Sequence, residues 1–520
     1  MKSNYKIKNY MKAILLAIII FYGNTMLSAC KKVNDVSQKD LPAKTYYVAV
    51  DGDDTNNGSI EYPFKSINYA LSQALAGDSV ILRGGTYVEK VKFPKSGVLN
   101  RYITLKAFKG ETPVISGQGF GVFGSEGLIT LSSVSWIILE GLEVTNFKTT
   151  TGSAIPDGIL VNGASSNIVI RKNRVHHIEH NGDPATGRQA HAIHVIGNST
   201  SPIMKVIVEE NEIHDNNTGT SENLTVNGYV MDFVVRKNKI YNGENIGICV
   251  AGGYLGNPNK AFNYARNGVV ADNEIWNIDG STGPVPALAN HGAIGIYIDG
   301  ARRIIIERNK VYDSDRGIGI VSENDEFPTE SCIVRNNFVY NSWLVGIYLG
   351  GYENYTGGGT KNCFVVNNTL YNNNRILGPE GVVEGEIRLT IGCFNNVIKN
   401  NILYARADKG VFINKQNAGG ENNIIGNNLY YTTGTITNWK WDAISYNNFN
   451  DWIAASGDSN SLFGVDPLFV NAAAYNLSLQ ASSRAIGVGQ INNQEGTTDF
   501  FGNPRTKNGL ISIGAHEVHQ

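Results

Sequence analysis

The chain has 520 residues and a net charge of −2, and it contains 58 Gly and 25 Tyr but only 14 Pro. Without residues 1–29, 40 basic residues face 46 acidic ones, a net charge of −6. A nucleic-acid-binding chain usually shows a basic surface, so we expect no nucleic-acid partner. Roughly 490 residues exceed one ordinary compact domain, whereas a solenoid escapes that limit because each repeat packs on its neighbours.

The N-terminus has the pattern of an export signal. Four lysines form a basic leader: Lys2, Lys6, Lys8 and Lys12. The apolar run over 13–21 that follows is too short to span a bilayer. Next comes Leu27-Ser28-Ala29-Cys30, which resembles the bacterial lipobox. The resemblance implies a lipoprotein signal peptide over 1–29, lipidation at Cys30 and a membrane anchor, with the outer membrane or cell surface as the expected location. Residues 30–44 are predicted to be a flexible tether.

Two features follow the tether. Residues 64–75 form the clearest amphipathic helix, with Ile67 and Leu71 on one face. Such a helix could cover the open end of a first coil, which would otherwise be an exposed sheet edge. A group of oxygen-bearing side chains precedes it: Asp51, Asp53, Asp54 and Asn56. These residues could bind Ca²⁺, but a polar turn accounts for them equally well, and no clear ligand cluster supports a calcium cofactor.

One motif recurs nine times: an aliphatic strand, an Asn, and then two positions later an apolar residue, usually followed by an aromatic one. The Asn residues are 27 to 38 positions apart: Asn173, Asn211, Asn238, Asn273, Asn309, Asn337, Asn368, Asn401 and Asn428. Asn side chains satisfy backbone groups in turns, and stacked aromatic rings add contact between coils. We therefore predict an Asn ladder and an aromatic column, with a sugar-stacking platform as the alternative role of the column.

Apolar residues alternate with polar ones before each Asn, as Ile304 and Ile306 illustrate, which is typical of a half-buried strand. Cys332 and Cys363 occupy this apolar column and are interpreted as core residues. A disulfide between them is the alternative, because stacked strands lie about 4.8 Å apart.

A second short strand opens each coil. The segments are 192–195, 223–226, 247–250, 295–298, 317–320, 346–349 and 386–389. Their aliphatic members are predicted to point inward, and the members between them outward. Two or three short strands per repeat, with no helices between them, indicate a parallel β-helix.

Both ends of the repeat region resemble a known family. Pro63-Phe64-Lys65-Ser66-Ile67 and Gly84-Gly85-Thr86-Tyr87 are similar to the N-terminal module of bacterial right-handed β-helix proteins, among them polysaccharide lyases of the pectate lyase, alginate lyase and chondroitinase type. Asp466-Pro467-Leu468-Phe469 resembles a C-terminal segment of surface-anchored β-helix proteins. The resemblance implies an all-β fold, a right-handed parallel β-helix solenoid with an N-terminal capping helix.

This fold predicts three parts after the tether. The cap and first coils are expected over 45–127, the β-helix over 128–435 and a C-terminal β-rich cap segment over 436–520. We expect a monomer.

Insertions indicate where chemistry could occur, because long loops on a rigid scaffold often carry function. They lengthen the turns on both sides of the opening strands: 179–190, 215–222 and 278–291 before, and 252–266, 324–330 and 351–361 after. The sequence therefore predicts a groove over the outward face of these strands, suited to an extended chain. We expect four substrate-binding side chains there: His194, Asn227, Tyr297 and Tyr348.

Two pairs of residues are candidate catalytic groups. Asp299 and Glu323 lie on adjacent coils, displaced by two positions, which places their backbones roughly 8 Å apart. An inverting glycosidase needs an acid and a base about 6.5–9.5 Å apart. Glu386 and Arg388 share one strand and are predicted to share one face. A lyase needs a base and a cation for the uronate carboxylate, and Arg388 could meet either need.

Other candidate sites are set aside. His191 and His194 are three positions apart on a strand, so they are predicted to point to opposite faces and not to share a metal, and we expect no metal site. His176 and His177 fall in the aromatic column. The Asp ligand set of the calcium-dependent pectate lyases has no counterpart in the coils, so no residue of that site can be carried over.

Three classes of function remain: a polysaccharide-cleaving enzyme, either lyase or hydrolase, a glycan-binding protein and a structural solenoid. The resemblance favours a polysaccharide-cleaving enzyme, and slightly a lyase acting on a uronic-acid-containing glycan. A glycoside hydrolase using the Asp299 and Glu323 pair is the first alternative. A non-catalytic glycan-binding surface lipoprotein is the second, and a purely structural solenoid the last.

Overall fold

The computed structural model describes residues 42–518, apart from 186, 255, 353–356 and 379–382. The predicted signal peptide, the lipidation site Cys30 and all but the end of the tether lie outside the described residues. None of the described helices is both long and apolar enough to cross a membrane.

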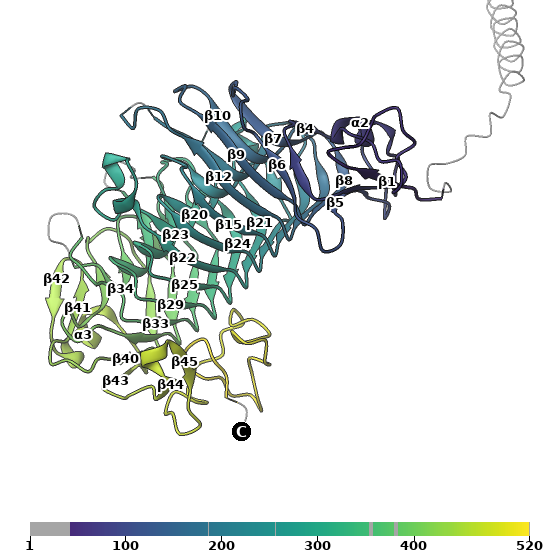
Figure 1. Cartoon of the computed structure of the whole chain (residues 1–520). Helices are drawn as coiled ribbons and strands as arrows, with labels where there is room; N and C mark the ends of the chain where they lie inside the picture. Colours follow the sequence, from purple (N-terminus) through teal and green to yellow (C-terminus); the bar gives the residue numbers. More distant parts are fainter. Residues whose placement is uncertain (1–41, 186, 255, 353–356, 379–382, 519–520) are drawn as a thin grey trace, which may run out of the picture. The chain divides into compact units, whose positions relative to one another are not determined.

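Three parallel sheets run along the described part of the chain, and successive coils contribute strands to each sheet in turn (Figure 1). Sheet A contains β1 (Thr45–Val48), β2 (Ser79–Leu82), β5 (Ile103–Ala107), β8 (Ser135–Glu140), β11 (Ser166–Arg171), β14 (Ile203–Glu209), β17 (Val230–Met231), β18 (Val234–Arg236), β21 (Arg266–Ala271), β24 (Arg302–Glu307), β27 (Thr329–Glu330), β28 (Ile333–Arg335), β31 (Thr360–Lys361), β32 (Phe364–Val366), β35 (Cys393–Phe394), β36 (Val397–Lys399) and β39 (Ile424–Gly426).

Sheet B contains β3 (Gly85–Tyr87), β6 (Pro113–Ser116), β9 (Glu143–Thr149), β12 (Arg174–His180), β15 (Glu212–Asn216), β19 (Lys239–Gly243), β22 (Glu274–Ile278), β25 (Lys310–Tyr312), β29 (Phe338–Tyr340), β33 (Thr369–Tyr371), β37 (Ile402–Tyr404), β40 (Leu429–Tyr431) and β43 (Leu462–Phe463).

Sheet C, which the predicted opening strands form, contains β4 (Val91–Lys92), β7 (Ser125–Ser132), β10 (Ile155–Asn162), β13 (His191–Gly197), β16 (Glu222–Gly228), β20 (Ile246–Ala251), β23 (Ile294–Asp299), β26 (Arg316–Ser322), β30 (Val345–Gly351), β34 (Gly385–Leu389), β38 (Val411–Lys415), β41 (Asn438–Trp441) and β42 (Ile444–Tyr446). Every pairing in the three sheets is parallel except that of β42 with β41, which is antiparallel. The predicted parallel β-helix is confirmed.

The Asn ladder is also confirmed. Asn309 is fully buried, and its backbone N and Nδ2 both donate to Oδ1 of Asn337, at 2.8 and 3.1 Å. Its Nδ2 also donates to the carbonyl of Val270. The same pattern links each Asn from Asn173 to Asn428 to the next one. The ladder satisfies turn groups inside the coil that water cannot reach.

The aromatic column stacks along sheet B. His176, His214, Tyr241, Trp276, Tyr312 and Tyr340 stack successively, with ring centroids 4.4 to 5.9 Å apart. Tyr475 of the C-terminal segment then stacks on Tyr340. The structural interpretation of His176 agrees with this stacking. Cys332 and Cys363 are buried free thiols in the core, as the core interpretation requires.

The N-terminal helix α2 (Ile67–Gln73) is shorter than predicted and buries Ile67, Ala70 and Leu71 in the core. Its role as a cap over the first coil stays a prediction. The Asp-rich segment before it forms a polar turn, in which Asp54 accepts hydrogen bonds from the backbone N–H groups of Lys65 and Ser66. These bonds hold the start of the helix and already use the Asp54 carboxylate.

The C-terminal segment contains α3 (Phe449–Ser456) and the hairpin of β44 (Phe469–Asn471) and β45 (Asn476–Leu479). It then runs along the coil turns. Asn336 donates to the carbonyl of Glu495, and Ala515 N donates to Oγ1 of Thr369. These contacts involve one side of the coils and leave the outward face of sheet C to other segments.

Candidate functional site

The strand register places the predicted substrate-binding residues on the outward face of sheet C. His194, Tyr297, Tyr348 and Arg388 fall in one column, through the pairing of each strand with the next. Asn227 lies in a neighbouring column that also contains Asp299. The predicted outward orientation of these six residues is therefore confirmed.

This face is more covered than the insertions suggested. His194, Tyr297 and Tyr348 are only 5%, 3% and 4% exposed, and Asp299 is fully buried. The face has its own apolar cluster, separate from the core of the coils: Ile246, Cys249, Ala251, Ile294, Tyr297, Val321, Val345 and Tyr348. Tyr254, from the segment after β20, donates its hydroxyl to Oδ2 of Asp299 on this face. The predicted open groove is thus a largely buried polar and aromatic layer.

Asp299 and Glu323 are brought together as predicted. Asp299 pairs with Val321 on the next coil, and Glu323 lies two positions further on. The backbone N–H of Glu323 donates to Oδ1 of Asp299 at 2.9 Å, and the Tyr297 hydroxyl donates to Oε1 of Glu323 at 2.6 Å. We call Tyr254, Tyr297, Asp299 and Glu323 the carboxyl–tyrosine cluster.

Burial shapes the protonation of this cluster. Burial first, and then the negative charge of Glu323, raise the pKa of Asp299 to about 7, against hydrogen bonds from Tyr254 and Glu323 that lower it. Burial also raises the pKa of the Tyr254 phenol, with Asp299 adding to the effect. A carboxyl group with a pKa near neutrality can both give and take a proton at physiological pH, which is what general acid–base catalysis requires.

The prediction that Glu386 and Arg388 share one face of their strand is wrong. Glu386 and Ile387 both point into the coil, so Glu386 and Arg388 lie on opposite sides of the strand. Glu386 is 1% exposed and accepts hydrogen bonds from Asn373 N at 3.0 Å and Nδ2 at 2.6 Å. Burial raises its pKa to about 8. Strict alternation failed here because the opening strand places two consecutive residues inward.

Arg388 instead pairs with Glu384. Its Nη1 lies 2.8 Å from Oε1 of Glu384, and Nη2 of Arg316 lies 3.4 Å from the same oxygen. Burial raises the pKa of Glu384, but the two guanidinium groups outweigh it and hold that pKa below its ordinary value. We call Arg316, Glu384 and Arg388 the arginine cluster, which carries one net positive charge.

The two clusters are neighbours. The Arg316 guanidinium lies 5.9 Å from the ring centre of Tyr348, and that ring stacks on Tyr297 at 6.4 Å. Several buried polar atoms on this face have no hydrogen-bond partner among the described residues: Oδ1 of Asn227, the Tyr348 hydroxyl, Oε2 of Glu384 and Nε of Arg388. Buried polar atoms are nearly always hydrogen-bonded, so these groups suit a polar ligand.

The prediction that His191 and His194 point to opposite faces is also wrong. Ala192 and Ile193 are both in the core, so the residues on either side of them both point outward. The centroids of the two imidazole rings lie 4.0 Å apart, and Nδ1 of His194 lies 3.1 Å from Oδ1 of Asp157.

Sequence reasoning missed several residues of this face. Asp157 pairs with His191 in the strand register, and Glu222 lies one coil further, with Oε2 3.5 Å from Nδ1 of His191. Arg316 occupies the equivalent position on β26. Extending the coil alignment to the position two residues before each inward Ile or Leu would have revealed this column. Tyr254 and Glu384 come from irregular segments that no repeat pattern could place.

Comparison with known proteins agrees with the architecture. The model of a Pel9A-like, right-handed β-helix region matches residues 46–225, and a right-handed β-helix region model matches 157–370 and 267–450. The uncharacterized protein YwoF of Bacillus subtilis (strain 168) is 33% identical over 441 residues, which cover 84% of this chain and 91% of YwoF. Pectate lyase PEL9 of Emericella nidulans is 40% identical over 78 residues, 15% of this chain and 19% of PEL9.

Among solved structures, the lacto-N-biosidase of Eubacterium ramulus superposes with a TM-score of 0.51 at 15% identity, covering 81% of this chain and 68% of that one. At this identity the likeness concerns the fold alone. The right-handed β-helix model, which matches more than half of the chain, and the long match to YwoF carry the assignment: this chain belongs to the right-handed β-helix family.

Proposed function

We propose that the chain is an extracytoplasmic polysaccharide-cleaving enzyme, a lyase that acts on a uronic-acid-containing glycan. The observation that carries this proposal is the adjacency of the carboxyl–tyrosine cluster and the arginine cluster on one face of sheet C. A β-eliminating lyase needs a base, an acid and a cation, and these two clusters supply all three.

The reaction assigns a task to each group. The bond between C5 and its hydrogen breaks, the bond between C4 and the glycosidic oxygen breaks, and a C4–C5 double bond forms. Glu323, the more exposed carboxylate, accepts the C5 proton. Asp299 returns a proton to the leaving oxygen through the Tyr254 hydroxyl that it binds. Arg316 and Arg388 hold the uronate carboxylate and stabilise the charge that develops as C5 loses its proton.

Two further observations support the proposal. The unpartnered atoms of Asn227, Tyr348 and Arg388 provide hydrogen-bonding positions for sugar hydroxyl and carboxylate groups. The relative PEL9 is named a pectate lyase, and the family model over 46–225 is named for Pel9A.

A glycoside hydrolase is the second candidate, and one observation favours it. Asp299, with a pKa of about 7, lies beside Glu323. Hydrolysis of a glycosidic bond needs one protonated and one ionised carboxyl group, and it needs no arginine.

A panel of acidic and neutral glycans tests both candidates on the purified protein. A lyase generates the ultraviolet absorbance of an unsaturated uronate together with new reducing ends. New reducing ends without that absorbance would establish the hydrolase and reject the lyase. Retention of a glycan without cleavage would reject both and leave a glycan-binding protein.

The cellular location is part of the proposal. The lipobox at Cys30 and the basic leader support export and anchoring by lipid, with the β-helix on the outer membrane or cell surface. An anchored enzyme of this kind would meet glycans outside the cytoplasm.

A further inference from the structure

A second group of side chains on sheet C lies outside the two clusters. Asp157, His191 and His194 come from the adjacent strands β10 and β13, and their possible ligand atoms all lie within 4.8 Å of one another. Asp157 is fully buried, and the two histidines are each 5% exposed. Two imidazoles and a carboxylate so close together form a donor set that transition metals prefer.

The neighbours of these residues hold them in place. Ser125 donates to Oδ2 of Asp157 at 2.8 Å, which leaves Oδ1 towards His194. Thr225 lies 2.9 Å from Nδ1 of His191 and donates to Oε2 of Glu222 at 2.8 Å. Groups that orient the ligands in this way are typical of metal sites, where they fix the ring orientation and the free carboxylate oxygen.

We propose that Asp157, His191 and His194 bind one divalent transition-metal ion, such as Zn²⁺, with Glu222 beside the site as a further oxygen donor. Zinc lies about 2.0–2.2 Å from nitrogen and oxygen ligands, so ligand atoms around a tetrahedral ion are about 3.3–3.6 Å apart. Nδ1 of His194 and Oδ1 of Asp157 are already 3.1 Å apart, and atoms up to 4.8 Å apart would need to approach by about 1.5 Å at most.

Another group with metal-binding residue types is less suited. Asp279, His291 and Asp315 also lie close together. However, Oδ2 of Asp315 already accepts the N–H groups of Gly280 and Ala293, and Oδ1 of Asp279 accepts two hydrogen bonds from Ser281. These bonds fasten the loop before β23 to the coil, so the structure gives this second group an internal role.

Zinc titration calorimetry on the whole mature chain, produced without a polyhistidine tag and freed of metal by a chelator, tests the proposal. We expect one equivalent of Zn²⁺ to bind and to raise the thermal unfolding temperature. Co²⁺ in place of Zn²⁺ should show a visible absorption band that reports nitrogen ligation.

Three variants locate the ion. His194→Gln removes a ligand, and we expect affinity to fall by at least about 100-fold. Ser125→Ala removes only the support of Asp157, and we expect a fall of about 10-fold, which keeps the test informative if His194→Gln does not fold. His291→Gln is the matched control and should bind as the parent does. The proposal fails if the parent binds no Zn²⁺, if Ser125→Ala and His194→Gln bind like the parent, or if only His291→Gln loses the ion.

Discussion

The backbone N–H of Glu323 donates to the carboxylate of Asp299 at 2.9 Å, which ties two carboxyl residues of adjacent coils together beneath Tyr254. Strand pairing, not a loop, brings the two residues together, because Asp299 pairs with Val321 and Glu323 follows two positions later. The coil thus sets the distance between the two groups, and burial, with the charge of Glu323 as a smaller cause, raises the pKa of Asp299 to about 7.

We expect Asp299→Asn and Glu323→Gln each to lower turnover by at least about 100-fold on an active glycan, because general acid–base groups typically contribute 100- to 10,000-fold. Asp299→Asn should also remove a limb of the pH–rate profile near pH 7. Steady-state kinetics measure both effects. Asp232→Asn is the control, since Asp232 lies in a left-handed turn that Asn tolerates. Near-parental rates in both cluster variants would place the chemistry on another face.

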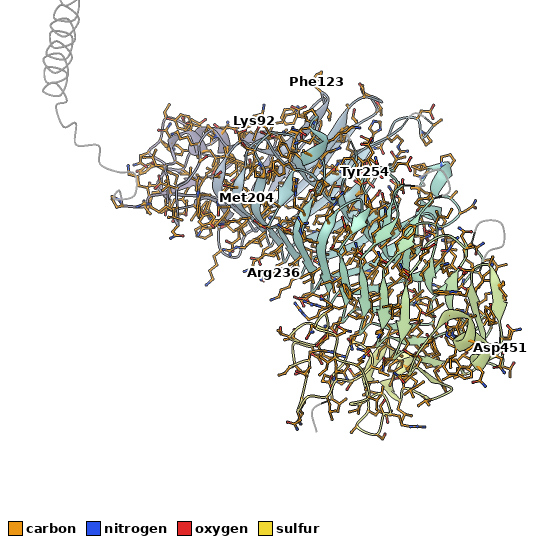
Figure 2. The ribbon with its side chains drawn as sticks, turned by 180° about the vertical axis from the view of Figure 1, so that it is seen from behind. Lys92, Phe123, Met204, Arg236, Tyr254 and Asp451 are labelled. Carbon is orange, nitrogen blue, oxygen red and sulfur yellow. The ribbon has the colours of Figure 1, made fainter. Side chains whose placement is uncertain are left out.

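Arg388→Gln tests the arginine cluster. If the enzyme is a lyase, this change should lower kcat/KM by at least about 10-fold, because a charge-assisted bond to the uronate carboxylate is lost. The loss of kcat/KM should be largest on glycans that contain uronate. Arg236→Gln is a suitable control, because Arg236 pairs with Glu209 on sheet A, away from Tyr254 (Figure 2). An equal effect on neutral and acidic glycans would contradict the role of Arg388 in holding a carboxylate.

Cys30→Ala tests the anchor. The lipobox-like segment predicts acylation of Cys30, so we expect the variant to move from the membrane fraction to the soluble fraction of lysed cells. Fractionation followed by immunoblotting measures this. A variant that stays in the membrane as firmly as the parent would show that lipidation at Cys30 does not anchor the protein.

The sequence was enough to predict the coils and much of the site. The Asn repeat gave the register, and the register placed Asp299 beside the coil of Glu323. Period-two alternation failed at one point in each opening strand, where two consecutive residues point inward. That single departure reversed the predictions for Glu386 and for the pair of His191 and His194.

Contacts from loops could not be predicted. Tyr254 reaches Asp299 across 45 positions of sequence, and Glu384 reaches Arg316 across 68. Neither residue belongs to the repeat, so no column indicates its place. The burial of the outward face has the same origin, because segments outside the repeat cover it.

Asn309→Ala tests the ladder that sets the register. The change removes the side chain that bonds Asn337 and the Val270 carbonyl, and leaves buried backbone groups without partners. We expect the free energy of unfolding to fall by about 1–3 kcal/mol, measured by urea denaturation. Asn198→Ala is the control, because the Asn198 side chain is exposed and accepts one hydrogen bond from Gly163. This change should lower the free energy of unfolding by less than Asn309→Ala does. Equal midpoints for Asn309→Ala and the parent would contradict a buried, stabilising ladder.

Glu386→Gln tests the consequence of burying a carboxyl group inside the coil. Burial raises the pKa of Glu386 from 4.5 to about 8, so between these values the folded chain keeps a proton that the unfolded chain has lost. The free energy of unfolding therefore has its full contribution from protonated Glu386 below about pH 4.5. This contribution falls as pH rises towards 8, by at most about 1.4 kcal/mol per pH unit. Gln carries no charge at any pH, so the variant should lack this decline.

Urea midpoints at about pH 5 and about pH 8 measure the decline, and the difference in midpoint between parent and variant should shift in favour of the variant at the higher pH. Parallel curves for the two proteins would mean that Glu386 ionises as readily in the folded chain as in the unfolded one, which would contradict its position inside the coil.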